Sequence, residues 1–176
     1  PDMLTGPNHI TLFFAAADYI HAFARAYGVH TEEDRVALRK KLEGHIRRRV
    51  DYAPDGSDTL VFSSENLSAN IGRAGLFSLH EMLAPIFDEI KVVCYVRRQD
   101  DGLLSMYAEH MRKGYSHGGF SDFIIKTQTD TEITKYADYN RLLTIWSEAF
   151  GQSNLIVRRF ERGDFQGNFG ILTDFI

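Results

Sequence analysis

The stretch KVVCYVRRQDDGLLSMY, from Lys91 to Tyr107, decides the fold of this chain. Its first part, Val92 to Val96, is an unbroken run of apolar residues that favour β structure. Such a run is typical of a parallel strand covered on both faces. Asp100 can cap the helix that follows. Apolar side chains then recur at helical spacing, at Leu103, Leu104, Tyr107 and Met111. The stretch predicts a buried strand, a sharp turn and a helix.

Arg97 stands at the carboxyl end of this strand, and Ser105 lies in the first turns of the helix. Open α/β sheets bind ligands at the carboxyl ends of their strands. An arginine supplies a planar fork that suits a phosphate, and a serine supplies a neutral donor. The pattern indicates a phosphate site. The alternative is that Arg97 and Arg98 pair with surface carboxylates.

Composition limits the classes of protein. A chain of 176 residues, 44% hydrophobic and 25% charged, is typical of a soluble globule, and we expect a single domain over 1–176. The net charge of −4 argues against a nucleic-acid binder. Cys94 is the only cysteine, which excludes an internal disulfide and suits a reducing compartment, so we expect a cytoplasmic protein. No run of residues is long enough to cross a bilayer, and there is no signal-peptide pattern. The seven histidines are scattered, so we expect no metal.

Periodicity and turn signals predict the other elements. We expect helices over 9–27, 31–50, 76–87, 121–126 and from 136 to a stop at Gly151, with short strands over 59–62 and 154–157. The segment 127–134 is polar and predicts a loop. The helix over 76–87 would connect the strands at 59–62 and 91–96, which predicts a right-handed βαβ unit. These elements together predict an α/β fold with a parallel sheet.

Arg97 followed eight positions later by Ser105, on a strand and then a helix, resembles the 3′-phosphate-binding element of sulfotransferases. Those enzymes use 3′-phosphoadenylyl sulfate (PAPS). The segment YVRRQDDGLLSMY is similar in sequence to a segment of bacterial sulfotransferase-like proteins that act on carbohydrates. The resemblance extends from about Pro7 to Phe175. It implies a three-layer αβα fold with a parallel sheet, of the P-loop-NTPase-like sulfotransferase type. It also implies transfer of a sulfuryl group from PAPS to a hydroxyl of a sugar or another acceptor, which leaves adenosine 3′,5′-bisphosphate.

The resemblance gives roles to several residues. Arg97 and Ser105 would hold the 3′-phosphate. Glu65 follows the expected strand over 59–62, and a carboxylate there could take the proton of the attacking hydroxyl. Ser63 and Ser64 could hold the phosphates of the nucleotide. The alternative is that 63–66 caps the next segment, with Glu65 hydrogen-bonded to the backbone.

Three further residues each have a functional and a structural interpretation. His9 belongs to an Asn-His pair that is familiar near the acceptor side of the related proteins, or it is a helix-entry residue with local hydrogen bonds. His117 lies in a glycine-containing loop over 113–119, which could contact the acceptor or serve only as a connector. Phe160 follows the strand that resembles the one facing the adenosine, so it could stack on adenine or belong to the core.

One expected part of such an enzyme is missing from the chain. A glycine-rich loop ending in Lys-Ser/Thr would hold the 5′-phosphosulfate, and the segment 70–75 is not one, because it has no such ending. We therefore expect that the fold is incomplete and that the chain lacks N-terminal and C-terminal parts of a longer protein. Two alternatives to a sulfotransferase are a nucleotide-dependent kinase-like enzyme and a non-catalytic interaction domain derived from the same fold.

Overall fold

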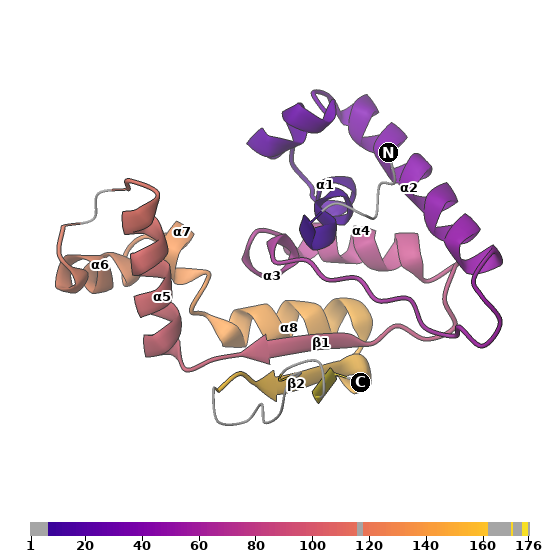
Figure 1. Cartoon of the computed structure of the whole chain (residues 1–176). Coiled ribbons are helices and arrows are strands. Elements are labelled where there is room, and N and C mark those ends of the chain that lie inside the picture. The colour runs from indigo at the N-terminus through magenta and orange to yellow at the C-terminus, as the bar shows by residue number, and fades with distance from the viewer. Residues whose placement is uncertain (1–6, 116–117, 162–169, 171–173, 176) are drawn as a thin grey trace. The chain divides into compact units, whose positions relative to one another are not determined.

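The computed structural model describes residues 7–115, 118–161, 170 and 174–175. These residues form a mixed α/β structure with a small parallel sheet of two strands and mostly helices (Figure 1). In chain order the described elements are η1 (Pro7–His9), α1 (Ile10–Ala16), η2 (Ala22–Tyr27), α2 (Glu32–Asp51), α3 (Asn66–Ala69), α4 (Arg73–Leu83), β1 (Val92–Val96), α5 (Gln99–Arg112), α6 (Phe120–Thr127), α7 (Thr131–Thr134), α8 (Tyr139–Phe150), η3 (Gln152–Asn154) and β2 (Leu155–Arg159).

The chain divides into two compact units. The first unit contains Pro1–Lys91 and Thr144–Asn154, and the second contains Val92–Leu143 and Leu155–Ile176.

The first unit is built from α1, α2 and α4, which pack against one another (Figure 1). Its core contains large apolar side chains that are almost completely buried, among them Leu12, Phe13, Phe14, Leu42, Ile46, Leu76 and Met82. The predicted helix over 31–50 is confirmed as α2, and its start is a capping box. The Thr31 hydroxyl accepts a hydrogen bond from the Asp34 N–H at 3.2 Å, and the Asp34 carboxylate accepts one from the Thr31 N–H at 2.9 Å. These two hydrogen bonds satisfy backbone N–H groups at the start of α2 that have no acceptor within the helix.

The predicted helix over 9–27 is wrong in its middle. The chain leaves the α-helix after Ala16 and forms a separate 3-10 helix, η2. The His21 imidazole accepts a hydrogen bond from the Phe23 N–H at 3.2 Å and so begins η2. The Tyr19 hydroxyl donates to the distant carbonyl of Asn70 at 3.0 Å. The break is therefore stabilised by contacts that helical spacing does not reveal.

The predicted strand over 59–62 is also wrong. This segment pairs with no strand among the described residues, and Leu60 and Val61 are 37% and 47% exposed. The βαβ unit expected between this segment and β1 is therefore not formed. The helix in between, α4, begins at Arg73 and ends at Leu83, before the predicted end at 87.

In the second unit β1 and β2 pair in parallel, with Val92 opposite Leu155 and Val96 opposite Arg159. The Phe160 N–H extends the ladder with a hydrogen bond of 2.7 Å to the Val96 carbonyl. Both predicted strands are confirmed, but the expectation that β1 is covered on both faces is wrong, because Val93 is 36% exposed. Because the strands are parallel, the residues that follow them lie at the same edge of the sheet.

The helices after β1 follow the prediction in outline. The predicted helix over 121–126 is α6, and the helix that stops at Gly151 is α8; Gly151 has a φ of 88°, which glycine adopts easily. The polar segment over 127–134 differs, because its end forms the short helix α7. None of the helices in the described part of the chain combines the length and the apolar character that a membrane span needs.

Candidate functional site

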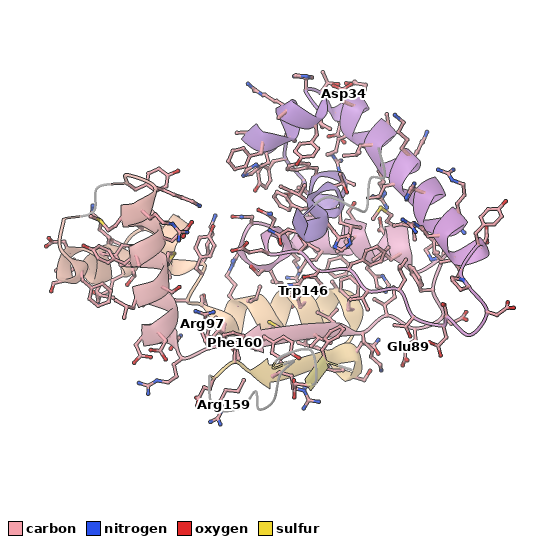
Figure 2. All side chains as sticks on the ribbon, in the orientation of Figure 1. Asp34, Glu89, Arg97, Trp146, Arg159 and Phe160 are labelled. Atoms are coloured by element: carbon pink, nitrogen blue, oxygen red, sulfur yellow. The ribbon has the colours of Figure 1, made fainter. Side chains whose placement is uncertain are left out.

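Arg97 is the centre of a small cluster at the carboxyl edge of the sheet. Its side chain is exposed, and its guanidinium carbon lies 4.9 Å from the centroid of the Phe160 ring, the first residue after β2 (Figure 2). A cation over an aromatic face at an exposed position contributes about 0.5–1 kcal/mol. The ring therefore supports the guanidinium where the strands end, and Arg97 occupies one face of the aromatic that we expected to stack on adenine.

The neighbouring arginine has a different environment. Two nitrogens of Arg98 donate to the two oxygens of Asp100, at 3.1 and 2.6 Å. Arg98 thereby lowers the pKa of the Asp100 carboxyl below its ordinary value. Arg97 forms no ion pair with any residue that the structure describes. Pairing with a surface carboxylate, the alternative for both arginines, therefore holds for Arg98, and within the described residues it does not hold for Arg97.

The prediction that Asp100 caps α5 is wrong. α5 begins at Gln99 with Arg98 in the capping position, so Asp100 lies inside the first turn. Its carboxylate accepts hydrogen bonds from Arg98 and from the N–H of Asp101 at 3.0 Å. Asp100 therefore neutralises the charge of Arg98 and leaves Arg97 available to an anionic ligand.

Gly102 brings α5 close to Arg97. A Cβ atom at Gly102 would lie 3.6 Å from Cγ of Arg97 and 3.5 Å from the hydroxyl oxygen of Tyr139. Ser105 lies three residues after Gly102 and is exposed, so it is on the same side of α5 as this contact. Arg97 and Ser105 do not hydrogen-bond to each other. The structure thus brings both predicted residues to one side of the sheet edge, with both side chains accessible to solvent.

Tyr139, the first residue of α8, belongs to this cluster and was not predicted. Partial burial raises the pKa of its hydroxyl, and hydrogen bonding to the main-chain N–H of Arg97 and the charge of Arg97 partly oppose this. Tyr139 is therefore a neutral hydroxyl at physiological pH. The sequence indicated only that Tyr139 lies near the start of a helix predicted from 136, and that position does not report a contact with Arg97.

The other predicted site residues that the structure describes belong to the first unit. His9 has a left-handed backbone with a φ of 38°, and Asn8 before it has a φ of 62°. Nδ1 of His9 lies 3.1 Å from the N atom and 2.9 Å from the O atom of Ser63. The tautomer decides which contact is a hydrogen bond, because only a protonated Nδ1 donates to the carbonyl. His9 is the capping residue of α1, as a helix-entry residue would be, but its side chain makes no capping hydrogen bond and contacts the distant Ser63 instead.

The segment 59–62 forms no strand, so the three residues after it do not lie at a strand end. These residues are Ser63, Ser64 and Glu65, and the prediction that they face the nucleotide site depended on that position. The hydroxyl of Ser64 is buried and has no hydrogen-bond partner within the described part of the chain. Ser63 is exposed. Glu65 is exposed and stands in the capping position of α3, but its side chain makes no capping hydrogen bond. The backbone-bound alternative for Glu65 is therefore not observed.

Two further points concern residues outside these clusters. His117 lies outside the described residues. Among the residues that are described, no group of three or more His, Cys, Asp and Glu side chains could hold a metal ion.

Comparisons with known proteins give little information on function. No protein-family model matches the chain, and no solved structure matches it. A protein of Archaeoglobus fulgidus, described as uncharacterized, is 33% identical over 87 residues. The aligned stretch covers 49% of this chain and 21% of the archaeal protein. The match thus spans about half of this chain and about a fifth of the length of that relative.

Proposed function

We propose that the Arg97 cluster binds the 3′-phosphate of an adenine nucleotide, and that the chain is part of a PAPS-dependent sulfotransferase. The observation that carries this proposal is the state of Arg97. Its guanidinium is exposed, rests on Phe160 at the end of a parallel strand, and has no carboxylate partner among the described residues.

The chemistry of the cluster fits a phosphate. The guanidinium offers a fork of N–H donors that matches two phosphate oxygens, and it keeps its charge at every physiological pH. Ser105 adds a neutral donor from the adjacent face of α5. The nearby acid Asp100 is neutralised by Arg98, so it opposes an incoming anion less than a free carboxylate would.

The proposed reaction moves a sulfuryl group from PAPS to an acceptor hydroxyl. The hydroxyl oxygen bonds to sulfur while the bond from sulfur to the phosphate oxygen breaks, and a base takes the hydroxyl proton. Glu65 is the proposed base, Ser63 and Ser64 are proposed to contact the nucleotide phosphates, and His9 and His117 the acceptor. A carbohydrate is the proposed acceptor, and a cytoplasmic location and the three-layer sulfotransferase fold are parts of the same proposal.

Isothermal titration with adenosine 3′,5′-bisphosphate in the absence of magnesium tests the donor site. Hydrogen bonds to charged groups contribute about 1.5–3 kcal/mol, so Arg97→Ala should weaken binding about 10- to 100-fold. Arg97→Lys should recover part of the loss, because it keeps the charge without the fork. Adenosine 5′-monophosphate should bind much more weakly than the bisphosphate and should not respond to Arg97→Ala.

Arg98→Ala is the matched control, because this neighbour has the same side chain and a carboxylate partner. It should change bisphosphate affinity by less than about twofold. Equal losses for the two variants, or none for Arg97→Ala, would count against a site at Arg97. Tighter binding of ATP with magnesium would favour the kinase-like alternative. Absence of nucleotide binding in a longer parent protein would favour a non-catalytic interaction domain.

A further inference from the structure

α5 presents an apolar stripe to solvent. No residue of this helix is buried, although it contains leucine, methionine and tyrosine side chains. Leu104 and Met111 are 52% and 49% exposed, and Ala108 between them is also exposed. Because α-helical residues four and seven positions apart share a face, these three side chains form one stripe along the helix.

The other sides of α5 already have partners within the second unit. Gly102 approaches Arg97 and Tyr139. The Tyr107 ring lies 5.4 Å from the rings of both Phe120 and Phe123 on α6. The residues that make these contacts are half-buried or buried, except for Arg97 and Phe120. The stripe of Leu104, Ala108 and Met111 lies on the remaining side.

The charges beside the stripe are arranged so that the helix complements a reversed copy of itself. Asp101 in the first turn forms no ion pair with a described residue. At the last turn Arg112 forms an ion pair with Glu109 but is 75% exposed, and Lys113 pairs with the same acid, so the two bases leave this end of the helix with a net positive charge. Asp101 and Arg112 are 11 positions apart, about three turns, so both lie on the same flank of the stripe. In an antiparallel pair, Asp101 of each copy would face Arg112 of the other.

We propose that a second copy of this chain docks on α5, with the two helices antiparallel about a two-fold axis near Ala108. Leu104 of each copy packs against Met111 of the other, and the small Ala108 side chains allow the helices to approach. A two-fold interface uses the same patch on both subunits, which the symmetric order of acid, apolar stripe and base provides. A stable complex buries about 800 Å² of surface on each partner, and three side chains offer less than that. The dimer is therefore weak, and its formation depends on concentration.

Sedimentation velocity over about 1 μM to 1 mM tests this proposal, with dissociation constants expected in the upper part of that range. Leu104→Glu should remove the dimer, because it places a charge in the apolar stripe of both copies. Tyr52→Glu is the matched control, since it changes a side chain that is 82% exposed in the first unit. Circular dichroism should show unchanged helix content in both variants.

A charge exchange tests the direction of the helices. Asp101→Arg alone or Arg112→Asp alone should abolish the dimer, since each places like charges opposite one another. The double variant Asp101→Arg with Arg112→Asp should restore it. A monomer at every concentration, or a dimer that persists in Leu104→Glu, overturns the proposal. Loss without recovery in the double variant overturns the antiparallel arrangement.

Discussion

The guanidinium carbon of Arg97 lies 4.9 Å from the centroid of the Phe160 ring, although the two residues follow different strands. The contact depends on the parallel register of β1 and β2, in which Val96 is opposite Arg159. It gives the cation at the sheet edge a defined position without an ion pair to any described residue.

We expect Arg97 and Phe160 to be energetically coupled. In a double-mutant cycle with Arg97→Ala and Phe160→Leu, the coupling free energy should be about 0.5–1 kcal/mol, the usual contribution of an exposed cation–π pair. Urea unfolding at pH 7 measures it. The cycle of Arg98→Ala with Phe160→Leu should be additive, and equal coupling in both cycles would contradict the assignment.

Thr31→Ala should lower the free energy of unfolding by about 1 kcal/mol, because the N–H of Asp34 loses its acceptor at the start of α2. Chemical denaturation measures the loss. Among the described residues the Thr59 hydroxyl bonds only to the neighbouring Asp58 side chain, so Thr59→Ala should change stability by less than about 0.5 kcal/mol. Equal effects of the two variants would argue against the capping role.

Asp34 should make stability depend on pH in the acid range. Hydrogen bonds from the backbone N–H groups of His30 and Thr31 lower the pKa of its carboxyl below 3.8. Its contribution is therefore fully present above the pKa of the unfolded chain and is lost as the pH falls through the lower folded value. Asp34→Asn should be less stable than the native chain at pH 7, and the difference should shrink as the pH falls below the ordinary aspartate pKa of 3.8, as measured by unfolding at each pH. A difference that does not change with pH would contradict this prediction.

Two helical glycines should respond to alanine in opposite directions. At Gly44 a Cβ would meet only a terminal nitrogen of Arg48 at 3.7 Å, so Gly44→Ala should stabilise α2 by about 0.5–1 kcal/mol. At Gly75 it would lie 2.7 Å from Ile71 Cγ1 and 3.1 Å from the Ala16 carbonyl oxygen. Gly75→Ala should therefore destabilise the first unit by about 1–3 kcal/mol. Thermal unfolding of the two variants distinguishes these effects, and a shared sign would be inconsistent with the packing.

Cys94 should react slowly in the folded chain. Burial in β1 raises the pKa of its thiol, which lowers the fraction of reactive thiolate at pH 7.5. Labelling with a disulfide reagent should be slower than for glutathione and should become fast in urea. Rapid labelling of the native chain would show that the thiol is accessible.

Local signals in the sequence were sufficient for several elements. The capping residues Thr31 and Asp34 are close in the chain, so the start of α2 was predictable from their order. The run over 92–96 identified β1, and the position of Arg97 at its end followed directly. Gly151 marked the end of α8, because a positive φ there suits glycine.

Contacts between distant residues could not be predicted in the same way. A strand requires a partner, and the apolar pattern over 59–62 does not reveal that none pairs with it in the described chain. The break after Ala16 depends on Tyr19 reaching the carbonyl of Asn70. Tyr139 joins the Arg97 cluster through tertiary contacts with Gly102 and with the backbone of Arg97, which leave no pattern in the sequence.

The composition of the first unit has a consequence for synthesis of the protein. Arg73 forms an ion pair of 2.7 Å with Glu148, and the His80 ring lies 5.2 Å from the ring of Phe150. Both partners belong to the segment Thr144–Asn154, which follows most of the second unit in the chain. A nascent chain that has left the ribosome only as far as Lys91 therefore lacks both of these contacts. They can form only after Glu148 and Phe150 have emerged.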